Sequence, residues 1–156
     1  ISLAKYVDKK IKIYDNFDIL IFGSLYLYKE KFVGKSSHHN NLFRLPYEFS
    51  IPHQSTFIKS ELYKKEKYSE LYKSSMDFEF FLRCKLRKYS FKTIDKFITV
   101  YCLGGQSSDI TLSAKEMKMA LENNIKSKLL LFYLLQINFR LIFLRKFIFK
   151  YLYFRQ

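Results

Sequence analysis

Apolar and polar positions along the chain recur with two periods, which predict helices in some segments and strands in others. Residues 1–13 carry apolar side chains at helical spacing with lysines between them, and they predict an N-terminal helix. The apolar, β-rich run over residues 17–28 predicts a buried strand. Residues 33–46, rich in Gly, Ser, Asn and His, predict a loop in which His38 and His39 are solvated.

The alternation of strands and helices continues through the second part of the chain. The stretch HQSTFIK, residues 53–59, is expected to form a second strand or an extended segment. Ser60 is expected to cap the helical or turn-rich segment that follows it. Residues 75–89 give the clearest helical pattern, and residues 90–103 predict one or two strands. Ser113 and Glu116 have the spacing of a capping box that opens another helix. Such an alternation favours a layered α/β fold.

Residues 126–156 form a tail in which Phe, Leu and Ile are punctuated by Lys and Arg. Its longest uncharged run covers residues 129–139, whereas a membrane-spanning helix needs about 20 apolar residues. We expect an amphipathic helical tail at the interface of an anionic membrane; the alternative is a terminal helix packed on the domain or on another subunit. The expected division is between residues 1–112 and a helical, basic-aromatic, membrane-associating part, residues 113–156.

Charge and composition narrow the class of partner. The chain has 156 residues and a net charge of +14, which calls for an anionic partner, although AT-rich coding DNA alone also enriches Lys, Ile, Asn, Phe and Tyr. Residues 125–156 contain seven basic residues and no acid. The length predicts one domain or a piece of a larger one. The charged residues near the N-terminus interrupt any apolar run there, so no signal peptide is expected. Cys84 and Cys102 predict buried free thiols in a reducing compartment.

Two carboxylates occur in the apolar stretch SSMDFEFFLRC. Asp77 falls in the first turn of the predicted helix, where free N–H groups and the helix dipole favour a carboxylate for structural reasons alone. Glu79 is two residues further on and does not share a helix face with Asp77, so the two are not a local acid–base pair. His53 begins an extended segment. Two roles stay open for this residue: ordinary hydrogen bonds at a strand edge, or a part in a functional site. Gly104 and Gly105 give a tight loop backbone freedom.

The order of the motifs is more specific than any one of them. PHQSTFIK, SSMDFEFFLRCKLRKYSFKTI and ITVYCLGGQSS follow one another, and with FDILIFGS they resemble the second half of bacterial family 2 glycosyltransferases with the GT-A fold. The resemblance covers roughly residues 1–120. It implies a partial GT-A-like mixed sheet flanked by helices. It also implies transfer of a hexose-type sugar from a nucleotide-sugar to an acceptor, often a lipid-linked glycan in surface polysaccharide synthesis.

The resemblance implies roles for individual residues. Asp77 matches the family's general base, which takes the proton of the acceptor hydroxyl while the nucleotide diphosphate leaves from the opposite face, so that the anomeric carbon is inverted. His53 and Gln54 match the strand beside the acceptor and donor-sugar cleft, and Glu79 is a second-rank substrate-binding neighbour. Further substrate contacts are implied in a loop near the active site, at Gly104, Gly105 and Ser107.

The chain departs from the family pattern in two respects. The family implies a divalent metal, Mg or Mn, but no Asp-x-Asp motif occurs in this sequence, and the N-terminal nucleotide-binding half is not in it. Ser24 replaces the acid often found after Tyr-Gly. We therefore expect a C-terminal fragment or a degenerate member of such an enzyme, inactive by itself. We expect it in the cytoplasm, peripheral on the inner face of the cytoplasmic membrane, with no specific nucleic-acid partner.

Two other classes of protein stay open. One is a non-catalytic basic protein that binds nucleic acid or anionic membrane through clustered Lys, Arg, Tyr and Phe, with an affinity that falls steeply with salt. No helix-turn-helix, zinc-finger or RNP-type motif in the sequence supports base-specific recognition. The other is a structural protein of the membrane interface.

Overall fold

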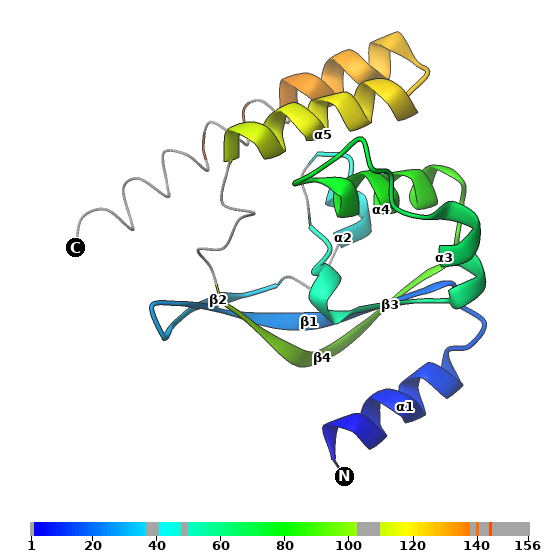
Figure 1. The fold of residues 1–156 in the computed structure, drawn as a ribbon, viewed down its shortest axis with the longest axis vertical. Helices are drawn as coiled ribbons and strands as arrows, with labels where there is room; N and C mark the ends of the chain where they lie inside the picture. Colours follow the sequence, from blue (N-terminus) through cyan, green and yellow to red (C-terminus); the bar gives the residue numbers. More distant parts are fainter. Residues whose placement is uncertain are drawn as a thin grey trace.

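A mixed four-stranded sheet lies between helices on both of its faces in the computed structural model (Figure 1). The structure describes residues 2–36, 41–47, 50–102, 110–137, 140 and 144. The expected fold class, a mixed α/β sheet flanked by helices, is confirmed in these residues. The expected division after residue 112 stays a prediction.

The central strand of the sheet is β1 (Ile19–Tyr28), with which each of the other three described strands pairs. β4 (Phe91–Cys102) runs parallel to β1 along one side. On the other side, β3 (Thr56–Ile58) pairs antiparallel with the start of β1, and β2 (Lys31–Lys35) pairs antiparallel with its end. The predicted buried strand is therefore confirmed.

The first six residues of β1 are buried on both faces, which explains why this part of the strand is mostly apolar. Because side chains alternate along a strand, Ile19 and Ile21 point into the main core, whereas Leu20 and Phe22 point to the opposite face. That opposite face is covered by α1 (Leu3–Ile13), as the helical spacing of the N-terminal residues predicts. Figure 1 shows α1 alone on its side of the sheet, with the other labelled helices on the other side.

The main core is built around α4 (Met76–Leu86), the helix with the clearest sequence pattern. Phe78, Phe80, Phe81 and Leu82 have no exposed surface, so the helix is apolar on more than one face. α3 (Ser60–Glu66) packs beside it, and α5 (Ile110–Asn124) covers it. A helix over residues 128–137 then folds back beside α5 (Figure 1).

The loop expected over residues 33–46 is wrong in part. Residues 33–35 belong to β2 instead. The turn at Lys29 and Glu30 folds the chain back along β1, so the backbone groups of residues 33–35 pair with that strand. A short helix, α2 (Asn41–Arg44), occupies residues further on. His38 and His39 lie outside the described residues.

Both expected helix caps are wrong. The residue before α3 is Lys59, and the Ser60 hydroxyl lies 3.1 Å from the carboxylate of its neighbour Glu61 rather than on a free amide. α5 begins three residues before Ser113, so Ser113 lies inside the helix. Glu116 does receive backbone N–H groups, but from the segment that precedes α4 instead of from its own helix. The spacing correctly indicated that Glu116 accepts backbone N–H groups, but these groups precede α4 and do not belong to the start of α5.

The C-terminal end of α4 has a Schellman motif with lysine in the position that favours glycine. The Tyr89 N–H donates to the Cys84 carbonyl at 3.1 Å, and the Lys88 N–H donates to the Lys85 carbonyl at 3.0 Å. Lys88 has a φ of 62°, in the left-handed region where a Cβ atom is unfavourable. The helix end therefore stores backbone strain at an exposed residue.

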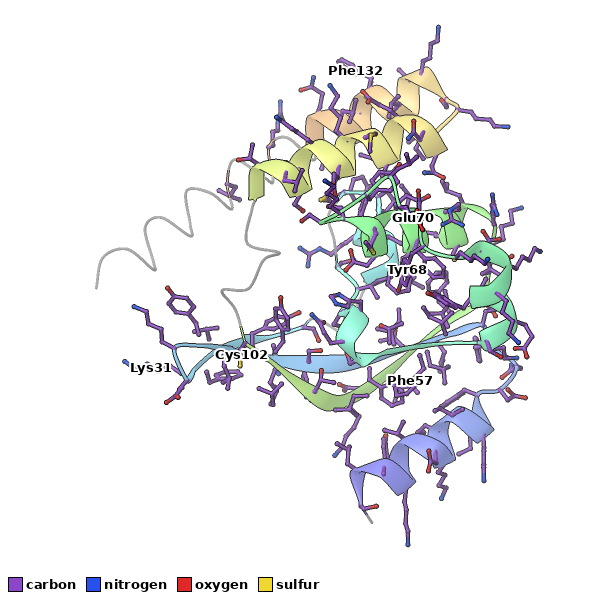
Figure 2. All side chains as sticks on the ribbon, in the orientation of Figure 1. Lys31, Phe57, Tyr68, Glu70, Cys102 and Phe132 are labelled. Carbon is purple, nitrogen blue, oxygen red and sulfur yellow. The ribbon has the colours of Figure 1, made fainter. Side chains whose placement is uncertain are left out.

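The two cysteines differ in exposure. Cys84 is buried in the main core as expected, and burial raises the pKa of its thiol to about 12. Cys102 is exposed at the C-terminal end of β4 (Figure 2), so the expectation that both thiols are buried is wrong for this one.

Candidate active site around Asp77

Asp77 lies in the first turn of α4, and a histidine from another segment meets its carboxylate. His53 opens η1 (His53–Ser55), a single turn that leads into β3, and its Nδ1 atom is 2.8 Å from Asp77 Oδ2. The other oxygen, Oδ1, accepts the backbone N–H of Phe78 at 2.8 Å. The Asp77 side chain is 17% exposed and that of His53 is 44% exposed, so the pair is accessible from solvent.

The η1 turn is anchored to the sheet by a buried cluster of hydroxyl groups. Ser55 Oγ donates to the Phe22 carbonyl of β1 at 2.8 Å and lies 3.0 Å from Ser24 Oγ. Ser24 Oγ is in turn 2.6 Å from Thr99 Oγ1 on β4. Ser24 is fully buried, so the serine at the place of the family's acid has a structural role here. The cluster fixes the turn from which His53 reaches Asp77.

The N-terminal end of α4 is held from the other side by Glu116 of α5. Its carboxylate accepts the backbone N–H groups of Lys73, Ser74 and Ser75 at 2.9, 2.8 and 2.8 Å. Burial alone raises the pKa of Glu116, but these three hydrogen bonds outweigh it and the pKa is lowered. The carboxylate thus stays ionised and positions the segment immediately before Asp77.

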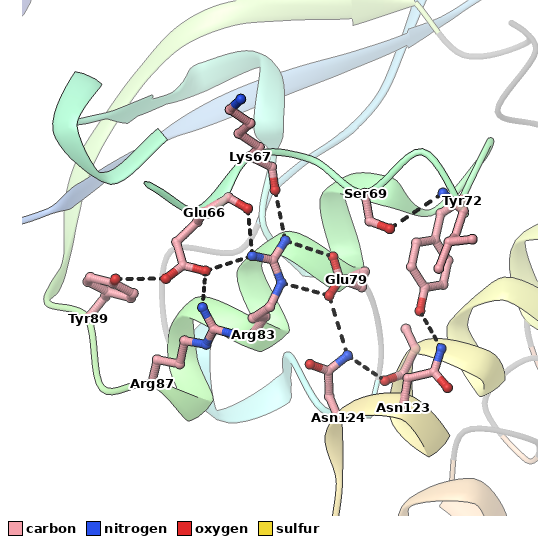
Figure 3. Close-up of polar contacts among 12 residues, drawn as sticks. Glu66, Lys67, Ser69, Tyr72, Glu79, Arg83, Arg87, Tyr89, Asn123 and Asn124 are labelled. Atoms are coloured by element: carbon pink, nitrogen blue, oxygen red, sulfur yellow. Dashed lines mark hydrogen bonds and ion pairs between the residues drawn. The ribbon is translucent and has the colours of Figure 1, made fainter. Parts of the chain in front are cut away.

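Glu79 lies in a buried ion-pair network with Arg83 (Figure 3). Both of its oxygens accept from Arg83, at 2.8 Å from Nε and 3.1 Å from Nη2, and its side chain is 5% exposed. Residues two apart on a helix point in nearly opposite directions, which explains the separation. The geometry therefore supports a structural role for Glu79, where the sequence predicts a substrate contact.

The same network joins the end of α3 to α4 through Glu66 (Figure 3). The Glu66 carboxylate has no exposed surface and accepts from Arg83 at 2.7 Å, from Tyr89 at 2.8 Å and from Arg87. Burial raises the pKa of Glu66, but the hydrogen bonds from Arg87, Tyr89 and Arg83 outweigh it and lower the pKa to about 2. This network orients α4, the helix that carries Asp77.

Tyr68 is a neighbour of Asp77 that sequence analysis missed. Burial raises the pKa of its hydroxyl to about 12, and the negative charge of Asp77 contributes to the shift. Its ring packs on Phe80, with 4.7 Å between centroids, and on Tyr63, at 5.7 Å. The hydroxyl therefore stays protonated at neutral pH. No motif marks this tyrosine, because only the folding of the segment between α3 and α4 brings it there.

The remaining predicted site residues are placed as follows. Gln54 follows His53 in η1 and is exposed. Gly104, Gly105 and Ser107 lie outside the described residues, and the predicted role of their loop stays a prediction. Within the described ranges, no group of three or more His, Cys, Asp and Glu side chains is arranged to hold a metal ion. The divalent metal that the resemblance implies stays a prediction.

Comparison with known proteins gives one limited similarity. Over 64 residues, the chain is 31% identical to an uncharacterized glycosyltransferase of Methanocaldococcus jannaschii. The matched part is 41% of this chain and 22% of that protein, so the chain spans about a fifth of its relative's length. No protein-family model and no solved structure matches the chain. The similarity supports a relationship to glycosyltransferases at the level of the class.

Proposed function

We propose that this chain forms the acceptor side of an inverting glycosyltransferase, with Asp77 as the general base. The observation that carries the proposal is the pairing of Asp77 with His53 at an accessible position. The two residues are 24 positions apart in the sequence and belong to two of the motifs that carry the resemblance. The similarity to a protein named as a glycosyltransferase is independent support.

The chemistry requires a carboxylate that is fixed in place and still able to accept a proton. A sugar hydroxyl is a poor nucleophile, and removal of its proton during attack lowers the barrier. In the proposed reaction the acceptor oxygen bonds to the anomeric carbon while the bond to the diphosphate breaks. The bonding pair leaves with the nucleotide diphosphate, and the hydroxyl proton goes to Asp77. Attack from the face opposite the leaving group inverts the anomeric carbon.

The contacts of Asp77 suit this role. Each carboxylate oxygen has one described partner, His53 Nδ1 for Oδ2 and the Phe78 amide for Oδ1. Because a carboxylate oxygen has two lone pairs, both oxygens keep the capacity to accept an acceptor proton. The contact between Nδ1 of His53 and Oδ2 restricts Asp77 to one orientation.

The proposal assigns only the acceptor side to this chain. The nucleotide and its divalent metal are assigned to residues outside it, so no step here depends on the metal. We propose a lipid-linked glycan of bacterial surface polysaccharide as the acceptor.

The test uses the enzyme that combines this chain with a nucleotide-binding domain. Asp77→Asn is expected to lower sugar transfer by roughly 100-fold or more, since a positioned base contributes about that much. Binding of the nucleotide-sugar, measured by calorimetry with a panel of UDP-hexoses, is expected to be unchanged. The control is Asp8→Asn, the same change at an exposed position of α1. Wild-type turnover by the Asp77→Asn enzyme would exclude Asp77 as the base.

A further inference from the structure

The helix over residues 128–137 has two apolar faces, and within the described part of the chain one of them packs into the core while the other is exposed. The helix begins after Ser127, whose hydroxyl and carbonyl accept the N–H groups of Leu130 and Leu131. Leu134 is 3% exposed in the main core, and Leu131 and Leu135 pack against the same cluster. This inner face anchors the helix, as the alternative of a tail packed on the domain expects.

The outer face of this helix consists of five large apolar side chains that are open to solvent. They are at least 40% exposed: Leu129, Leu130, Phe132, Tyr133 and Ile137. The rings of Phe132 and Tyr133 lie edge to face, with 5.9 Å between centroids. Figure 2 shows Phe132 on the side of the helix that points away from the sheet. Apart from Gln136, which is exposed between Phe132 and Tyr133 on the same face, this surface is apolar, and an exposed apolar surface marks an interaction site because a soluble protein rarely leaves one uncovered.

The charges around the outer face identify its partner. Lys126 and Lys128 are exposed at the start of the helix, and Arg140, which is also helical, is exposed. Residues 125–156 contain seven basic residues and no acid. A second copy of this chain would bring two such basic surfaces together and add to the repulsion between two +14 chains. An anionic lipid surface instead offers negative headgroups to the cations and an acyl boundary to the apolar side chains.

We propose that the outer face of the 128–137 helix lies in the surface of an anionic lipid bilayer, while its inner face keeps the domain attached. Phe132 and Tyr133 then sit at the level of the headgroups, where aromatic side chains are favoured. None of the helices in the described part of the chain is long and apolar enough to cross a bilayer, which suits a helix lying along the surface. Docking needs no catalysis, so it can fail or succeed independently of the role of Asp77.

The experiment measures co-sedimentation of the protein with vesicles of phosphatidylcholine, with and without phosphatidylglycerol. Wild type is expected to bind the anionic vesicles at least roughly tenfold more tightly, and this preference should weaken as salt rises. The double variant Leu129→Ser/Phe132→Ser is expected to lose roughly tenfold or more of the binding to anionic vesicles. The matched control is Phe32→Ser/Leu71→Ser, at two apolar side chains that are 63% and 73% exposed on other segments.

A second measurement keeps the test valid if the double variant does not fold. The chain has no tryptophan, so Phe132→Trp introduces a single fluorescent reporter on the outer face. Its emission is expected to shift to shorter wavelength with anionic vesicles and to remain unchanged with neutral ones. The proposal is overturned if wild type does not bind anionic vesicles, or if both serine double variants lose binding equally. It is also overturned if light scattering shows a dimer that only Leu129→Ser/Phe132→Ser dissociates.

Discussion

Replacing Glu66 by glutamine tests whether the buried network between α3 and α4 stabilises the fold. The change keeps the size of the side chain and removes one charge that two arginines and a tyrosine share. Arg83 is the more shielded of the two arginines, with a side chain 14% exposed, against 56% for Arg87. We therefore expect most of the effect to come from leaving Arg83 with fewer acceptors.

The magnitude follows from the pKa of Glu66, which falls from 4.5 to about 2 on folding. At about 1.4 kcal/mol per pKa unit, the ionised carboxylate contributes about 3 kcal/mol of stability at neutral pH. The sign is that of an acid with a lowered pKa in the folded state. The unfolded chain takes up the proton first as the pH falls below about 5, so the contribution is lost progressively down to about pH 2.

The assay is urea unfolding of wild type and Glu66→Gln, followed by far-UV circular dichroism. We expect the variant to be less stable by about 3 kcal/mol at about pH 7. The difference should shrink by about 2 kcal/mol at about pH 3, because part of the wild-type contribution is then lost. Glu70→Gln is the control, since Glu70 is exposed in the segment that follows α3 (Figure 2). We expect this control to stay within about 0.5 kcal/mol of wild type.

Two results would refute this reasoning. A loss at neutral pH no larger than that of Glu70→Gln would mean that the Glu66 contacts contribute nothing beyond the cost of burying the carboxylate. A loss of the same size at neutral and acidic pH would mean that packing, rather than the charge of Glu66, supports the end of α3.

Three further predictions test other parts of the molecule. Lys88→Gly is expected to raise the free energy of unfolding by about 1 kcal/mol in urea titrations, because glycine removes the strain of the left-handed residue; an unchanged or lower value would contradict this. Iodoacetamide is expected to modify Cys102 in the native protein and Cys84 only after denaturation, as counted by mass spectrometry; rapid native labelling of both would contradict the burial of Cys84. Glu116→Gln is expected to lower the free energy of unfolding by about 1–3 kcal/mol, measured by thermal unfolding, because an amide NH₂ group then faces backbone N–H donors. Glu122→Gln, on the exposed side of α5, is the control and should change the free energy of unfolding little.

The local pattern of apolar residues was sufficient to predict the main elements. The strand β1 is recognisable from its apolar run, and the helix α4 is recognisable from apolar residues at i, i+3, i+4 spacing. The loop at residues 33–46 was the weakest prediction. Its backbone conformation depends on a partner strand, and a strand at the edge of a sheet has little pattern of its own.

The candidate site was only partly visible in the sequence. Asp77 and His53 were both singled out, but their contact depends on η1 being held by Ser55 and the buried hydroxyl groups behind it. Tyr68 had no signal at all, because a tyrosine in a turn-rich segment is typical of many surfaces. Its position near Asp77 follows from the path of the chain between α3 and α4.

The sequence by itself determined most of the helices and strands, though not β2 or α2, and it showed where the positive charge is concentrated and which carboxylate is the candidate base. Only the tertiary structure decided what each polar side chain contacts. In the tertiary structure Glu79 pairs with Arg83, and Glu116 accepts backbone N–H groups from the segment before α4. One face of the 128–137 helix packs into the core, and the other is exposed. The physical reason is that periodicity reports whether a residue is buried, whereas the partner of a charge is set by packing between segments far apart along the chain.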